Sequence, residues 1–243
     1  MTVIANPIYD AVFKFLMEDK EVAKILLSAL LKKEIIDLEM HRHERTSMEQ
    51  TRIFSLRIDF SAKVREKDGA EHLIIIKLQK TRPITETLRS RQSPDTQCPN
   101  KENSIEKKNE DGQKRNPGVP TVSIYILGLA LEGIAEPVVY VRSSNLDYDG
   151  NPLPAPDPFI GSLTQDSIFV QIPLLTGRTR NRLERLLGVF NQECRQPDNA
   201  HYLEIDEEHV DEEVKCVVHR LRKAAAAPDV RRAMEIENED IWK

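Results

Sequence analysis

Three polar residues of one predicted hairpin, Asp59, Lys77 and Gln79, have types and spacing that could perform chemistry. Two stretches of strand-like sequence flank a turn at Gly69, a residue that is free to adopt positive φ. A three-residue loop ending at Gly69 sets Asp59 directly opposite Lys77, with their Cβ atoms about 5 Å apart. Gln79 then points to the same face as Lys77, because side chains alternate along a strand. The hairpin is therefore expected to present an acid, a base and an amide together.

Elements predicted before the hairpin would support it. Asn6 and Pro7 have the types expected of an N-cap and a first helical residue, and apolar residues follow at helical spacing. Asp19 marks a break before a second amphipathic helix over 21–32. A weakly alternating strand is expected over 35–43, next to the hairpin.

After the hairpin the pattern changes several times. A short helix is expected over 85–92, and the nearly apolar-free segment 93–118 is expected to be a flexible insert. Further strands are predicted over 119–127, 137–141 and 167–172. Helices are predicted from Thr176 or Gly177, over 206–227, and from Pro228 onward. We therefore expect an α/β protein with a core over 1–145 and a mainly helical extension over 146–243.

The order of these motifs resembles that of a known family. The matching stretches are NPIYDAVFKFL, the IDF around Asp59, IIIKLQ, SIYILG, and the segment from SIFVQIPLLTGRTRNRLERLLGVF onward. Together they resemble the PD-(D/E)xK nuclease family transposases, which are relatives of the recombination-promoting nucleases. The resemblance implies a restriction-endonuclease-like fold, in which helices flank a small mixed sheet, and a magnesium-dependent DNA endonuclease activity.

The resemblance also implies a function for individual residues. Asp59 would bind Mg²⁺, which prefers oxygen ligands and lowers the pKa of a bound water that attacks the phosphodiester. Gln79 matches the Lys or Gln that orients this water. Asp10 matches an acid of the first helix, and Lys14 lies one helical turn further on. Asp10 and Lys14 alternatively form an exposed i,i+4 pair worth about 0.2–0.5 kcal/mol.

Lys77 departs from the family pattern, because it stands where a second metal-binding acid is expected. A charged lysine donates hydrogen bonds and does not ligate a metal. Opposite Asp59 it would form a cross-strand pair worth about 0.2–1 kcal/mol and compete with Mg²⁺. We therefore expect impaired cleavage, unless Glu86 on the following helix supplies the missing acid.

Basic residues suggest DNA as the partner. The candidate DNA-binding residues are Lys14 of the first predicted helix, Arg89 and Arg91 after the hairpin, and Arg178 and Arg182 before the apolar stripe of a later helix. Such side chains contact phosphates in many complexes, or they form a solvated face. Two alternatives to the nuclease therefore stay open: a DNA-binding pseudo-nuclease that has lost cleavage, and a protein–protein interaction module.

Composition sets limits on the class of protein. The net charge of −5 argues against a globally basic nucleic-acid binder, although a local basic patch is compatible with it. The three scattered cysteines fit a reducing compartment. No apolar run approaches the roughly 20 residues of a membrane span. We expect a cytoplasmic protein that has no membrane segment.

Overall fold

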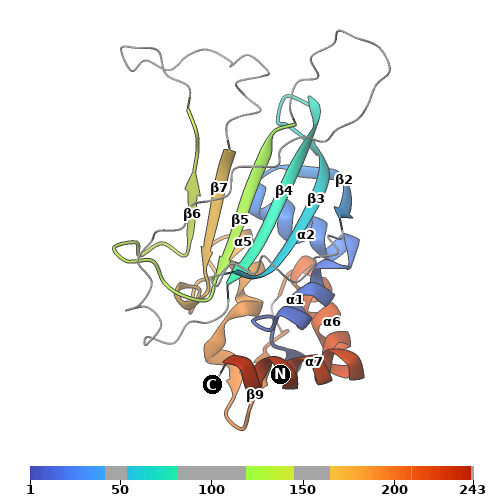
Figure 1. Cartoon of the computed structure of the whole chain (residues 1–243), viewed down its shortest axis with the longest axis vertical. Coiled ribbons are helices and arrows are strands. Elements are labelled where there is room, and N and C mark those ends of the chain that lie inside the picture. Colours follow the sequence, from blue (N-terminus) through green and yellow to red (C-terminus); the bar gives the residue numbers. More distant parts are fainter. Residues whose placement is uncertain (42–53, 82–118, 145–164, 209, 242–243) are drawn as a thin grey trace.

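A mixed six-stranded sheet forms the centre of the computed structural model, which describes residues 1–41, 54–81, 119–144, 165–208 and 210–241. The strand order is β2-β3-β4-β5-β7-β6 (Figure 1). These strands are β2 Glu34–His41, β3 Phe54–Arg65, β4 Glu71–Thr81, β5 Thr121–Leu127, β6 Val138–Val141 and β7 Gln165–Gln171. A second sheet has the order β1-β9-β8, with β1 Thr2–Ala5, β8 Arg195–Gln196 and β9 Asn199–Ile205. The α/β class, with helices beside a mixed sheet, agrees with the prediction.

Strand directions divide the main sheet into two parts. Strands β2, β3 and β4 are antiparallel neighbours, whereas β5 runs parallel to β4 and β7 runs parallel to β5. Strand β7 comes from the C-terminal half of the chain, yet it lies between β5 and β6. Strand β1, at the N-terminus, pairs with β9. The predicted boundary at residue 145 therefore does not separate two sheets, and 146–243 contains strands as well as helices.

The β3–β4 hairpin has the predicted register. Gly69 adopts φ 86°, and the Glu66 N–H donates to the Ala70 carbonyl at 2.9 Å to close the loop. Asp59 is the direct partner of Lys77. The turn chemistry and the alternation of side chains were therefore sufficient to predict this part of the sheet.

Strand β4 shows that the two faces of the sheet have different environments. Ile74, Ile76 and Leu78 are buried in the hydrophobic core. Lys77 and Gln79 alternate with them and are half-buried on the opposite face. We call the first face the helix face and the second the polar face.

Five α-helices lie in the described part of the chain. They are α1 Asp10–Met17, α2 Lys20–Leu31, α5 Arg182–Leu187, α6 Glu212–Ala226 and α7 Pro228–Ile241, and short 3₁₀ turns span Ile172–Leu174, Gly188–Phe190 and Gln192–Cys194. Helix α2 lies behind β3 and β4, whereas α1, α6 and α7 gather at the end of the molecule near the small sheet (Figure 1). None of the helices in these ranges is long and apolar enough to cross a membrane.

The first helix begins later than predicted, and Asn6 is not its N-cap. Helix α1 starts at Asp10, after a turn in which the Asn6 Oδ1 accepts from the Ile8 N–H at 3.1 Å. The Asn6 Nδ2 donates to the Ala200 carbonyl at 2.9 Å and to the Gln192 side-chain oxygen at 3.0 Å. Asn6 is 1% exposed, so it ties the N-terminal segment to the C-terminal third of the chain.

The helix predicted from Thr176 or Gly177 also begins later. Gly177 has φ 64° and belongs to a turn. The N-cap is Asn181, whose side chain accepts from the Glu184 N–H at 2.9 Å. Asparagine is a favoured N-cap residue, and this signal was present in the sequence.

We predict that Asn6→Ala lowers the free energy of unfolding by about 2 kcal/mol, because it leaves buried amide groups without partners. Urea unfolding monitored by circular dichroism measures the change. The control is Asn199→Ala, which removes an exposed side chain that makes one local bond, to the His201 N–H. Equal midpoints for the two variants would contradict the assigned function of Asn6 in linking both ends of the chain.

Candidate functional site

Asp59, the leading candidate of the predicted site, is a buried carboxylate in the middle of β3, with 6% of its surface exposed. Arg57 lies two residues earlier, on the same face of the strand. Its Nε and Nη2 donate to the two oxygens of Asp59 at 3.0 and 2.9 Å. Such a bidentate contact is among the strong hydrogen bonds of proteins. Both carboxylate oxygens of Asp59 therefore face a guanidinium.

A row of polar residues crosses the polar face at Asp59. Register places His41 of β2 on one side of Asp59 and Lys77 of β4 on the other. The row continues to Ser123 of β5 and Ser167 of β7. The chain thus brings together an acid, a lysine, a histidine and two hydroxyl groups across five neighbouring strands.

Gln79 lies one step further along β4 and is the register partner of Arg57. On its other side, Gln79 faces Tyr125 of β5. The Tyr125 ring stacks on the Phe169 ring, with 4.7 Å between the ring centroids. The structure therefore places Gln79 beside Lys77 on the polar face, as predicted. It also places a second cation, Arg57, in the same neighbourhood.

The described residues offer a magnesium ion a single carboxylate at this position. Mg²⁺ requires several oxygen ligands in near-octahedral geometry, and carboxylates usually supply the protein part. Within the described ranges, no group of three His, Cys, Asp or Glu residues has metal-binding geometry. Asp59 is the only carboxylate of the cross-strand row, and Arg57 already binds both of its oxygens. Glu86, the other predicted ligand, lies outside the described residues.

Asp10 lies on the helix face, away from the polar row. Its Oδ1 accepts from the ammonium of Lys80, which is fully buried at the end of β4. Lys80 and Lys77 are three positions apart on one strand and therefore point to opposite faces. The predicted grouping of Asp10 with Asp59, Lys77 and Gln79 is thus divided by the sheet.

Glu237 of α7 completes a charged cluster around Asp10. Its two carboxylate oxygens accept from the Asp10 N–H at 2.7 and 2.9 Å, and one also accepts from the Ala11 N–H at 3.4 Å. An anion at a helix N-terminus satisfies free N–H groups and interacts favourably with the helix dipole. Burial, together with the nearby Asp10 charge, raises the pKa of the Glu237 carboxyl above its ordinary value.

The predicted DNA-binding residues occupy different positions. Lys14 is exposed in the last turn of α1, where a cation favours the helix dipole. Arg178 pairs with Glu136 at 3.3 Å, and Arg182 makes a bidentate pair with Glu213 of α6 at 2.6 and 2.8 Å. Arg178 and Arg182 thus connect elements of the fold. Arg89 and Arg91 lie outside the described residues.

Arg57, Lys80 and Glu237 are charged residues of these clusters that the sequence analysis did not identify. The position of Arg57 beside Asp59 could have been predicted, because alternation along a strand puts residues 57 and 59 on the same face. Lys80 ends an apolar strand, but nothing in its sequence neighbourhood indicates complete burial. Glu237 contacts Asp10 across 227 positions, and no local pattern carries that information.

We predict a pH-dependent stability difference between the wild type and Glu237→Gln. A carboxyl group with a raised folded-state pKa contributes stability that is complete below its unfolded pKa and is lost as pH rises through the folded pKa. The wild type should therefore lose its advantage over the variant as the pH rises above about 4.5, the ordinary value of the group. Thermal unfolding of both proteins between pH 4 and pH 8 tests this, and an advantage that grows toward pH 8 would contradict it.

Comparisons of this chain with protein-family models, with curated proteins and with solved structures found no match. The structure itself shows a mixed six-stranded sheet with flanking helices.

Proposed function

We propose that the chain is a DNA-binding protein of PD-(D/E)xK architecture whose magnesium-dependent cleavage is impaired. The observation that carries this proposal is the environment of Asp59, which has Arg57 on its oxygens and Lys77 directly opposite. In the family that the sequence resembles, an acid would occupy position 77. One carboxylate between two cations is poorly suited to hold Mg²⁺.

The order of the elements supports the architecture. Helices α1 and α2 precede three antiparallel strands, of which the second carries Asp59 and the third carries Lys77 and Gln79. Strand β5 then returns parallel to β4, and a parallel neighbour requires a crossover connection. This helix–strand–strand–strand–crossover–strand order is the one that the sequence resemblance implies.

The charge of the polar face supports a nucleic-acid partner over a metal. A lysine in place of an acid changes the local charge by two units in the positive direction. Lys77 and Arg57 lie beside Gln79, and the half-buried hydroxyl of Ser167 belongs to the same row. Donors of these types commonly contact phosphates. A negatively charged phosphodiester would therefore interact more favourably with this row than Mg²⁺ would.

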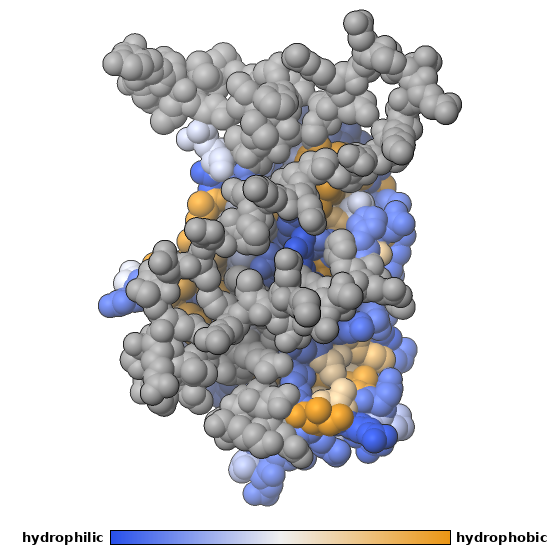
Figure 2. Space-filling view, viewed as in Figure 1, coloured by the Kyte–Doolittle hydropathy of each residue, from blue (hydrophilic) through white to orange (hydrophobic). Residues whose placement is uncertain are grey.

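A second candidate function, a protein–protein interaction module, is favoured by a different observation. Met1, Val3 and Ile236 expose 95%, 45% and 61% of their surface. They belong to the N-terminal segment and to α7, which lie at one end of the molecule, and Figure 2 shows apolar side chains at the surface there. Exposed apolar patches of this kind often mark binding surfaces for other proteins.

We predict that Lys77→Glu raises magnesium-dependent plasmid cleavage above the background level of the wild type, because it restores a second carboxylate opposite Asp59. Adding Arg57→Gln should raise cleavage further, since the guanidinium then no longer competes for the carboxylate oxygens. Asp59→Asn in the Lys77→Glu background should return cleavage to background. Gel analysis of supercoiled plasmid, with and without Mg²⁺, measures the rate.

The matched control for this series is Lys67→Glu, which makes the same charge change at an exposed turn residue. It should leave cleavage at the wild-type level. If the wild type itself cuts and Asp59→Asn abolishes the cutting, a carboxylate other than residue 77 completes the site, and the proposal of impaired cleavage is wrong.

We also predict that metal-free DNA binding by the wild type weakens with salt, because bound cations are released when basic side chains neutralise phosphates. Replacing Lys77 by Gln should reduce the slope of log K against log salt by about 0.9, the contribution of one phosphate contact. Fluorescence anisotropy with labelled duplex DNA measures the slope. Arg178→Gln and Lys67→Gln serve as controls and should keep the wild-type slope. Absence of DNA binding at low salt would favour the interaction module instead.

A further inference from the structure

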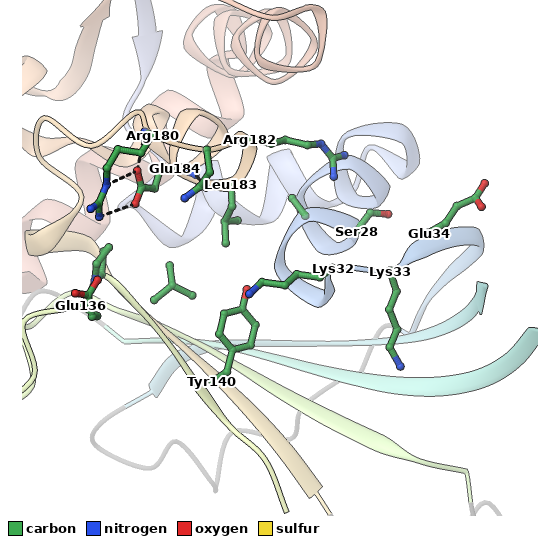
Figure 3. Close-up of a pocket in the computed structure, with 14 residues that line it drawn as sticks. Ser28, Lys32, Lys33, Glu34, Glu136, Tyr140, Arg180, Arg182, Leu183 and Glu184 are labelled. Carbon is green, nitrogen blue, oxygen red and sulfur yellow. Dashed lines mark hydrogen bonds and ion pairs between the residues drawn. The ribbon is translucent and has the colours of Figure 1, made fainter. Parts of the chain in front are cut away.

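A large cavity lies on the helix face of the sheet, separate from the polar row. Its volume is about 1030 Å³, and it is lined by the C-terminal end of α2, by β6 and by the start of α5 (Figure 3). Tyr140 of β6 pairs with Ile168, which belongs to the buried row that contains Leu78. The cavity therefore opens on the opposite side of the sheet from Asp59. Its size is at the upper end of the range of small-molecule sites.

The floor of the cavity is apolar, and its rim is charged. Ala29, Val138 and Leu183 supply aliphatic surface, and the Leu183 side chain projects toward the cavity in Figure 3. The charged residues of the lining come from the end of α2, the start of β2, the segment before β6 and the start of α5. This combination suits a ligand that has an apolar body and a charged end.

Nearly every charge at the rim is neutralised by another side chain. The ion pairs are Lys33–Glu66, Arg65–Glu34, Arg178–Glu136, Arg180–Glu184 and Arg182–Glu213. Lys32 is the exception, because no carboxylate among the described residues pairs with it. Its ammonium instead lies 4.0 Å from the centroid of the Tyr140 ring. A cation–π contact of this kind leaves the positive charge available to an anion.

The backbone at Lys32 supports a specific function for this side chain. Lys32 is the C-cap of α2 with φ 57° and ψ 32°, and it is the only non-glycine residue with positive φ in the described ranges. Glycine or asparagine usually occupies this left-handed position, and other residues are strained there. Strained positions of this type are concentrated at functional sites. The strain here places an ammonium at the mouth of the cavity.

Tyr140 is itself held in place. Its hydroxyl donates to the Leu30 carbonyl in the last turn of α2 at 3.0 Å. The Tyr140 ring, over which the Lys32 ammonium lies, is thus fixed between β6 and α2. Preorganisation of this kind lowers the cost of ordering a side chain when a ligand binds.

We propose that this cavity binds an organic anion composed of one carboxylate group on an aliphatic body, with the carboxylate on Lys32. The aliphatic body lies against Ala29, Val138 and Leu183. The single uncompensated ammonium selects one negative charge, and the apolar floor selects against inorganic anions. This site is independent of the proposed function of the polar face.

Isothermal titration of octanoate into the full chain tests the proposal. The wild type is expected to bind one octanoate per chain, and Lys32→Met is expected to bind it at least tenfold more weakly. Lys33→Met is the matched control, because Lys33 also lines the cavity but pairs with Glu66; its affinity should stay within twofold. Val138→Trp should abolish binding by filling the floor. Octan-1-ol, which lacks the charge, should bind equally to the wild type and to Lys32→Met.

A second variant separates a ligand-binding function from a structural one. Lys32→Gly should raise the melting temperature by a few degrees, because glycine adopts the left-handed conformation without strain, and it should weaken octanoate binding as Lys32→Met does. A fall in melting temperature would assign Lys32 a structural function and overturn the proposal. Undetectable octanoate binding by the wild type, or equal affinities for the wild type and Lys32→Met, would overturn it as well.

Discussion

The buried ammonium of Lys80 is the constraint on which the arrangement of the helices around the sheet depends. An unpaired charge in a protein core is strongly unfavourable, and removal of one partner from a buried pair costs about 3–5 kcal/mol. Asp10 supplies the partner, and this requires α1 to begin at the end of β4. Glu237 in turn accepts from the first N–H groups of α1, and this requires α7 to pack there. One charge thus connects the sheet, the N-terminal helix and the C-terminal helix.

The alternation of β4 assigns this cluster and the polar row to separate faces. Lys80 must face the core with Leu78, so Lys77 and Gln79 must face away from it. Asp10 therefore forms a structural ion pair with Lys80 on the helix face. Asp59 lies on the polar face, where its neighbours are Arg57 and Lys77. The same strand consequently gives the fold its buried link and gives the polar face its positive charge.

The hairpin could be predicted because its information is local. Gly69 sets the turn, the turn sets the register, and the register sets Asp59 opposite Lys77. The elements that were missed depend on distant partners. Asn6 has the residue type of an N-cap, but its side-chain amide instead donates hydrogen bonds to Gln192 and Ala200, which are distant in the sequence. Strand β9 could not be identified before its pairing with β1 was known.

The candidate site on the polar face could likewise be predicted only where its residues are close together in the sequence. Asp59, Lys77 and Gln79 were predicted to lie together because they share a hairpin, and they do. Asp10 was grouped with them through a sequence resemblance, which carries no information about the face to which a side chain points. Arg57 was overlooked, although it binds the carboxylate on which the predicted site depends.

The charges around Asp59 also stabilise the middle of the main sheet. Two carboxylates on adjacent strands, about 5 Å apart, repel each other unless a cation lies between them. A lysine at position 77 replaces that repulsion by attraction, and Arg57 adds a bidentate pair to the same buried acid. Arg57 and Lys77 therefore stabilise the buried carboxylate of Asp59 within the sheet, and Lys77 contributes positive charge to the polar face.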